Sequence, residues 1–155
     1  MLDYSATAGP ITGKLLPTGN AIDIISIPGI GRIELSIVYA ANRVCFIKPS
    51  ALNLSGIEGP LDPKILDALK TIELIRGTAA KMIGLVDDVT KSRVASPAIP
   101  LLAIVSKPKN YTSFTDGRKI EADTIDFVSR VFYMQEMHKT YSATATVCTG
   151  AAAMI

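Results

Sequence analysis

Residues 62–84, DPKILDALKTIELIRGTAAKMIG, predict the longest helix of the chain and set the layout of the fold. Asp62 suits the N-cap position, and Pro63 suits the first helical position. Apolar residues then recur at helical spacing until Gly84, which is typical of a helix end. The predicted apolar face comprises Ile65, Leu66, Leu69, Ile72, Leu74, Ile75, Ala79, Ala80, Met82 and Ile83.

Strand patterns lie on the N-terminal side of this helix, and residues 1–48 as a whole favour β structure. A turn is expected at residues 28–31, where the sequence is PGIG. Residues 44–47 form a short apolar strand that ends at Lys48-Pro49. Before the turn the first strand has alternating Ile22 and Ile24, with Ser26 next in the same register; after it, Ile33, Leu35 and Ile37 alternate with Glu34, Ser36 and Val38.

On the C-terminal side, residues 87–100 predict an exposed connection and residues 101–105 a buried strand. The polar stretch 107–119 predicts a loop with its tip at Asp116-Gly117. A further strand is expected over 124–132, with Ile125, Phe127 and Val131 on one face. Residues 142–155 are almost all small and apolar, and a helix of that kind is expected to be buried within a domain as a core helix cut short.

Composition excludes several classes of protein. The 155 residues are 48% hydrophobic and 19% charged, which argues against disorder. The net charge of +2, without a basic run, argues against nucleic acid. No apolar run approaches ~18 residues, and no signal peptide is evident, so we expect no membrane span and a cytoplasmic location. Cys45 and Cys148 are expected to be buried free thiols.

Residues 12–20, TGKLLPTGN, combine a turn, a cation and small polar residues around one proline. Such a loop presents backbone N–H groups, a hydroxyl, an amide and an ammonium to one point, which suits a carboxylate ligand. The polar candidates are Lys14, Thr18, Gly19 and Asn20. The alternative is a hairpin that binds nothing.

TGKLLPTGN also resembles the signature of the PrpF family of cofactor-independent isomerases. That family includes 2-methylaconitate cis–trans isomerases, methylitaconate isomerases and oxalomesaconate tautomerases. The resemblance continues in order along nearly the whole chain, which is more specific than any single motif. Residues 40–42 and 44–47 match the family sequence AANPCVFV, and residues 52–58 match LGLTGTE. Residues 73–76 and 79–80 match LEAIRxxAA, and residues 82–85 follow that match. Residues 129–130, 138–139 and 144–149 match the family's SR…MGxxHxxxxxTGAVCT.

The resemblance implies an α+β fold like that of diaminopimelate epimerase, in which an antiparallel sheet wraps around a central apolar helix. Family members have two such domains with the substrate between them. Residues 1–20 are expected to form the interdomain connection, and residues 21–155 an incomplete second domain. We expect this chain to lack the N-terminal domain, which in the family carries the lysine proposed to transfer the proton and a cysteine near the substrate.

The resemblance further implies that Asn42, Ser142 and Thr144 contact a substrate carboxylate. Ser142 opens a helix whose free N–H groups suit an anion. Where the family has Thr-Gly-Ala, this chain has Thr144-Ala145-Thr146, so close backbone approach to a ligand is in doubt. Arg43 replaces a family proline and could add a cation. His138 is a candidate for proton transfer, although a lone histidine is more often structural.

The expected reaction moves a proton or a double bond beside the carboxylates of a small tricarboxylate, and it needs fixed donors together with an acid and a base. The resemblance implies no cofactor. One histidine and two cysteines cannot form a metal site of recognised spacing, and GxGxxG, P-loop and GxSxG motifs are absent. Two other hypotheses stay open: a non-catalytic remnant that self-associates as a homo-oligomer, and a small-anion-binding module.

Overall fold

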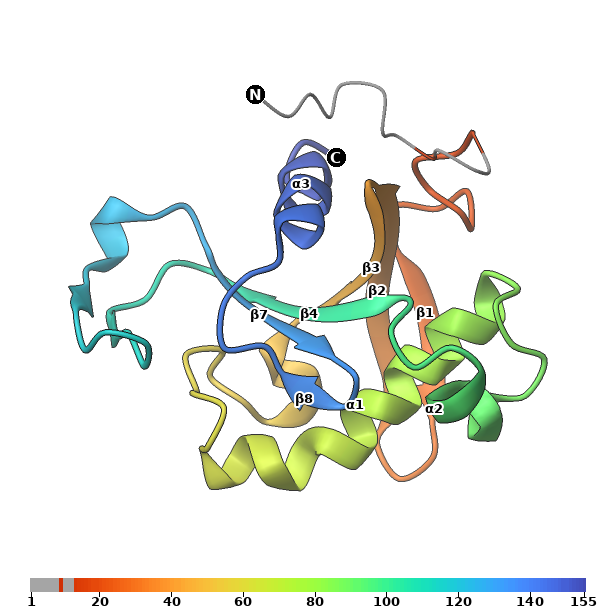
Figure 1. Ribbon diagram of the computed structural model, residues 1–155, viewed down its shortest axis with the longest axis horizontal. Helices are drawn as coiled ribbons and strands as arrows, with labels where there is room; N and C mark the ends of the chain where they lie inside the picture. Colours follow the sequence, from red (N-terminus) through yellow and green to blue (C-terminus); the bar gives the residue numbers. More distant parts are fainter. Residues whose placement is uncertain (1–8, 10–12) are drawn as a thin grey trace.

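The computed structural model describes residue 9 and residues 13–155. Six strands form one sheet in the order β1-β2-β3-β4-β7-β8, with α1 on one face and α3 on the other (Figure 1). The remaining strands, β5 and β6, pair with each other. The strands are β1 Asp23–Ile27, β2 Gly31–Ala40, β3 Asn42–Ile47, β4 Leu101–Ser106, β5 Tyr111–Thr112, β6 Lys119–Ile120, β7 Val128–Tyr133 and β8 Glu136–Met137. The helices are η1 Pro49–Leu52, α1 Pro63–Met82, η2 Val89–Lys91, α2 Ser92–Ala95, η3 Ala122–Thr124 and α3 Ala143–Ala152.

The sheet is antiparallel except for one pair of strands. Strands β1, β2 and β3 form successive hairpins, and Ala41 turns the chain between β2 and β3 with φ of 58°. Strand β3 pairs in parallel with β4 because the crossover between them contains α1. Strands β4, β7 and β8 then continue antiparallel. The predicted α+β class with a mainly antiparallel sheet is confirmed.

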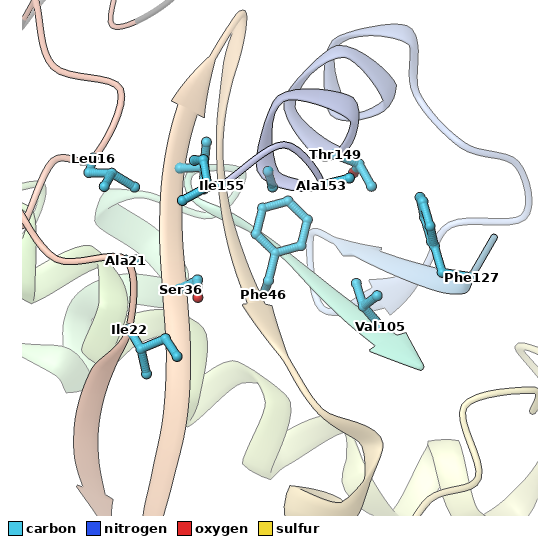
Figure 2. Close-up of a pocket in the computed structure, with 12 residues that line it drawn as sticks. Leu16, Ala21, Ile22, Ser36, Phe46, Val105, Phe127, Thr149, Ala153 and Ile155 are labelled. Carbon is cyan, nitrogen blue, oxygen red and sulfur yellow. The ribbon is translucent and has the colours of Figure 1, made fainter. Parts of the chain in front are cut away.

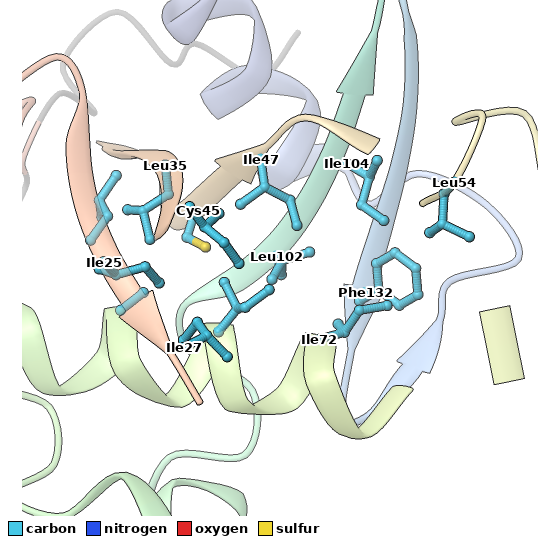
Figure 3. Packing of buried hydrophobic residues seen from close by; sticks show 14 of the residues in the cluster. Ile25, Ile27, Leu35, Cys45, Ile47, Leu54, Ile72, Leu102, Ile104 and Phe132 are labelled. Carbon is cyan, nitrogen blue, oxygen red and sulfur yellow. The ribbon is translucent and has the colours of Figure 1, made fainter. Parts of the chain in front are cut away.

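Helix α1 covers the first face of the sheet, as its sequence predicts. Asp62 caps the helix, since its Oδ1 accepts a hydrogen bond from the N–H of Lys64 at 2.9 Å. Leu66 and Met82, predicted on the apolar face, are instead exposed at its edges. The core beneath α1 consists largely of side chains that alternate along the strands (Figure 3). It includes Ile25, Ile27, Ile33, Leu35, Ile37, Cys45, Ile47, Ile65, Ile72, Ile75, Leu102, Ile104 and Phe132.

Helix α3 packs on the second face of the sheet. The opposite-facing residues of the same strands, among them Val38, Val44, Leu101 and Val131, form a second apolar cluster with Ala145 and Cys148 of α3. Within the described residues, the helix predicted to be a buried core helix is covered on one side. Only Ala145, Cys148 and Thr149 of α3 are buried, because α3 lies on a single sheet face.

Three other sequence expectations need correction. In β1 the core residues are Ile25 and Ile27, while Ile24 is exposed, as is Ile22 just before the strand. Strand β7 begins at Val128 rather than at residue 124, because η3 occupies 122–124. The connection 87–100 contains η2 and α2, and Ser92 within it is buried against α1. The β structure expected over residues 1–8 and 10–12 lies outside the described residues.

Cys45 and Cys148 are buried and free, as predicted. They belong to different clusters, one under α1 and the other under α3. Within the part of the chain that the structure describes, no helix is long and apolar enough to cross a membrane.

Candidate anion site at the start of helix α3

A small hollow of about 310 Å³ lies at the N-terminal end of α3. Four of the seven residues that line it are polar residues singled out in the sequence: Asn42, His138, Ser142 and Thr144. Asn42 is the first residue of β3, His138 follows β8, Ser142 is the N-cap of α3, and Thr144 lies in its first turn. The remaining lining residues, Leu101, Val131 and Tyr133, were missed, because nothing local in the sequence marks them.

The side-chain amide of Asn42 is held by hydrogen bonds at both its nitrogen and its oxygen. Its Nδ2 donates to Thr144 Oγ1 at 3.2 Å, and its Oδ1 accepts from the N–H of Arg43 at 2.8 Å. The first of these bonds joins residues 102 positions apart in the chain. It therefore fixes the β2–β3 turn against the first turn of α3.

Ser142 caps α3, since its Oγ accepts from the N–H of Ala145 at 3.4 Å. The first N–H groups of a helix lack intrahelical partners and carry a partial positive charge, which favours an anion nearby. Ala145, which stands where the family has glycine, is fully buried in the cluster beneath α3. Its methyl group therefore packs toward the sheet and is not part of the lining of the hollow.

His138 is oriented by its neighbour Thr140. The His138 Nδ1 accepts a hydrogen bond from the N–H of Thr140 at 3.2 Å. In the neutral ring an accepting Nδ1 leaves the proton on Nε2. The ring also lies beside Tyr133, with centroids 6.3 Å apart. His138 can therefore present an N–H donor at the wall of the hollow.

The loop containing Lys14, Thr18, Gly19 and Asn20 does not line this hollow. Thr18 Oγ1 donates to Asp23 Oδ2 at 2.6 Å, and Asn20 Nδ2 donates to Asp23 Oδ1 at 2.8 Å. Asp23 is buried. The loop thus holds a carboxylate, as its composition suggests, but that carboxylate belongs to the same chain.

Lys14 and Gly19 of this loop are exposed, and Gly19, with φ of 85°, closes a turn by donating its N–H to the carbonyl of Leu16 at 3.0 Å. The spacing of Asp23 from Thr18 and Asn20 is the sequence signal that could have indicated the internal bond. Arg43 is not among the residues that line the hollow, and its guanidinium lies 4.2 Å from the centroid of the Tyr39 ring.

Two side chains, the half-buried Tyr141 and the buried Cys148, hold α3 against the sheet. Tyr141 Oη is 2.8 Å from Ser129 Oγ on β7 and 2.9 Å from Thr149 Oγ1 on α3. Cys148 Sγ donates to the carbonyl of Val38 at 3.3 Å. Burial raises the pKa of the Cys148 thiol to about 11, so it stays protonated at neutral pH and is a poor nucleophile.

The fold and the sequence agree on one family. The model of the PrpF protein family matches residues 1–155. A solved structure described as methylitaconate-delta-isomerase superimposes with a TM-score of 0.93 at 43% identity, covering 99% of this chain and 40% of that one. The chain therefore belongs to the PrpF family, and its diaminopimelate epimerase-like α+β fold is that of a methylitaconate isomerase structure.

Named relatives of this chain are isomerases. A 3-methylitaconate isomerase of Eubacterium barkeri is 42% identical over all of this chain and 41% of its own length. A 2-methyl-aconitate isomerase of Shewanella oneidensis is 32% identical over 92% of this chain and 36% of its own length. The chain thus spans about two fifths of the length of the relatives it matches.

Proposed function

We propose that this chain is part of a cofactor-independent isomerase that moves a proton or a double bond in a small unsaturated tricarboxylate such as 2-methylaconitate. Membership of the PrpF family and the names of the relatives support this proposal. The observation that carries it is the Asn42–Thr144 hydrogen bond, since it brings an amide to the N-terminal end of α3.

In this proposal the start of α3 holds one substrate carboxylate. The Ser142 and Thr144 hydroxyls, the first N–H groups of the helix and the Asn42 amide supply neutral donors, and donors to an ionised group form the stronger hydrogen bonds. His138 supplies a further donor through Nε2–H. Donors fixed in this way also stabilise the enolate-like charge that develops when a proton leaves the carbon beside a carboxylate.

The remaining chemistry is proposed to lie outside these residues. The lysine proposed to transfer the proton in the family is proposed to lie outside these 155 residues, so we expect the 155-residue chain alone to be inactive. Residues 1–20 are proposed as the interdomain connection and residues 21–155 as part of the second domain. Lys14, Thr18, Gly19 and Asn20 are proposed to shape the region between domains.

A second candidate function is a self-associating or anion-binding module without turnover. The observation that favours it is the exposed apolar surface beside α3, which includes Ile22 and Ile155. The two functions differ in whether the chain supports catalysis once the rest of the fold is supplied.

The test is a chimera in which residues 1–155 replace the matching part of the Eubacterium barkeri relative. The allylic methylene and methyl protons of 2-methylaconitate are followed by NMR in deuterated water. We expect exchange or isomerisation by the chimera and none by the chain alone. Thr144→Val should lower kcat/KM by about tenfold or more, the loss of one hydrogen bond to a charged group, while the exposed Thr112→Val is the matched control.

A folded chimera without activity would contradict the proposed reaction. Turnover by the 155-residue chain alone would contradict the assignment of proton transfer to residues outside it.

A further inference from the structure

The hollow at the start of α3 has two chemically different sides. The hydrogen-bonding groups come from the start of β3, from the residue after β8 and from the start of α3. The other side consists of Leu101, Val131 and Tyr133. No lysine, arginine, aspartate or glutamate is among the described residues that line the hollow. A ligand there therefore meets neutral donors on one side and apolar surface on the other.

Tyr133 is the residue of the apolar side with the most open surface. Leu101 and Val131 are 3% and 2% exposed, whereas Tyr133 is 41% exposed. Tyr133 follows Val131 by two residues in β7, so both side chains belong to the sheet face on which α3 packs. The Tyr133 ring is tilted by 59° to the ring of His138, with which it shares the wall of the hollow.

A two-residue turn fixes the place of Tyr133 in the sheet. Strands β7 and β8 pair through Tyr133 and Glu136, which leaves Met134 and Gln135 as the turn. Both turn residues have positive φ, 50° and 66°, as the tightest hairpin turns require. A shift by one residue would move Tyr133 to the other face of the sheet and break this turn. The position of Tyr133 at the hollow is therefore built into the hairpin.

The two sides of the hollow favour different parts of one ligand. A carboxylate bound by the donors leaves the neighbouring part of the ligand against the apolar side. A second carboxylate at that place would lose its water without gaining a hydrogen-bond partner, which is costly. An alkyl group at that place would instead remove apolar surface from water, which is favourable.

We propose that Tyr133 determines specificity at this site. Its ring accepts an alkyl substituent on the carbon that bears the bound carboxylate, and it disfavours a second charged group there. This inference rests on the proposed function for the carboxylate at the start of α3. It goes further because it assigns the choice between substituents to one residue.

The experiment compares citraconate with maleate, two dicarboxylates that differ by one methyl group on a carboxylate-bearing carbon. Dissociation constants are measured by titrating the ¹⁵N-labelled 155-residue chain and following amide chemical shifts. We expect citraconate to bind about tenfold more tightly, which is the effect of one methyl group in an apolar site.

Three variants show whether Tyr133 causes this preference. Tyr133→Ser should reduce the ratio of the two dissociation constants to about threefold or less, since most of the apolar contact is lost. Tyr133→Phe keeps the ring and should retain the ratio. Phe114→Ser is the matched control, because Phe114 is also 41% exposed but lies outside the hollow. A purely structural effect of Tyr133→Ser would weaken both acids equally and leave the ratio unchanged.

Three results would overturn the proposal. Equal affinity of the unchanged chain for the two acids, with saturable shifts at residues 142–146, would leave the carboxylate site standing but remove the role of Tyr133. An unchanged ratio in a Tyr133→Ser variant that circular dichroism shows to be folded would assign the preference to other residues. Absence of binding of either acid to the folded chain would contradict the carboxylate site itself, and this inference with it.

Discussion

Replacing Arg76 by methionine tests whether the pairing of Arg76 with Glu73 in α1 stabilises the fold. Arg76 is 2% exposed, and its guanidinium donates to both carboxylate oxygens of Glu73, at 2.7 and 2.6 Å. It also donates to the carbonyls of Ser92, Ser96 and Ile99 at 3.2, 2.7 and 3.2 Å. These bonds fasten the connection 87–100 to α1 just before β4 begins.

The expected cost of Arg76→Met is large because methionine fills the space without donating. Removing one partner of a buried ion pair costs about 3–5 kcal/mol, since the other charge stays buried and unpaired. A domain of this kind has about 5–15 kcal/mol of stability in total. With a urea m-value of about 2 kcal/mol per M, the unfolding midpoint should fall by about 2 M.

The assay is equilibrium urea unfolding followed by far-ultraviolet circular dichroism. Arg93→Met on the exposed side of α2 is the matched control and should change stability by no more than about 0.5 kcal/mol. Combining Arg76→Met with Glu73→Gln should cost less than the sum of the single changes, because no buried anion then remains. An Arg76→Met variant as stable as the Arg93→Met control would refute this account of the pair.

Three further predictions concern single groups. Tyr141→Phe should lower the free energy of unfolding by about 1–2 kcal/mol, because the hydroxyl bridges Ser129 and Thr149; an unchanged urea midpoint would contradict the bridge. Burial raises the pKa of Glu58, but hydrogen bonds to its carboxylate outweigh this and hold the pKa below its ordinary 4.5. That stabilisation is complete above the ordinary pKa and is lost as pH falls through the pKa of the folded state. Glu58→Gln should therefore lower the free energy of unfolding at neutral pH and reduce its further decrease in acid. Curves of unfolding free energy against pH that run parallel for the two proteins would contradict this role of Glu58. Cys148, with its pKa raised to about 11, should react with a thiol reagent at neutral pH only when urea unfolds the chain, and rapid native labelling would contradict its burial.

The sequence predicted those elements whose signals are local. Asp62, Pro63 and the helical spacing that follows them defined α1 without reference to the rest of the chain. The apolar run at 101–105 likewise identified β4. In both cases the residues that stabilise the element are also the residues that mark it.

Apolar periodicity did not show which residues the described fold buries. Ile22 and Phe127 are as apolar as core residues, yet both line an open hollow beside α3 (Figure 2) and are exposed. Residues 142–155 are apolar all round, but α3 buries only one side. Exposure depends on which layers cover the sheet, and this is a property of the assembled fold that no local pattern encodes.

The candidate site, like the fold, could be predicted from the sequence only in part. The composition of the 12–20 loop indicated carboxylate binding, and the structure shows Thr18 and Asn20 bonded to Asp23. Asn42 and Thr144 lie too far apart in sequence for any spacing argument to join them. Only the family resemblance placed them in one site, and their role in binding a substrate stays a proposal.

The most direct test of the account is the binding of a tricarboxylate at the start of α3. The measurement is titration of the ¹⁵N-labelled 155-residue chain with cis-aconitate, followed by amide chemical shifts. The account predicts saturable shifts centred on Asn42 and residues 142–146, abolished by Asn42→Ala and retained in Thr112→Val. Absence of shifts there, or shifts centred on the 14–20 loop instead, would contradict it.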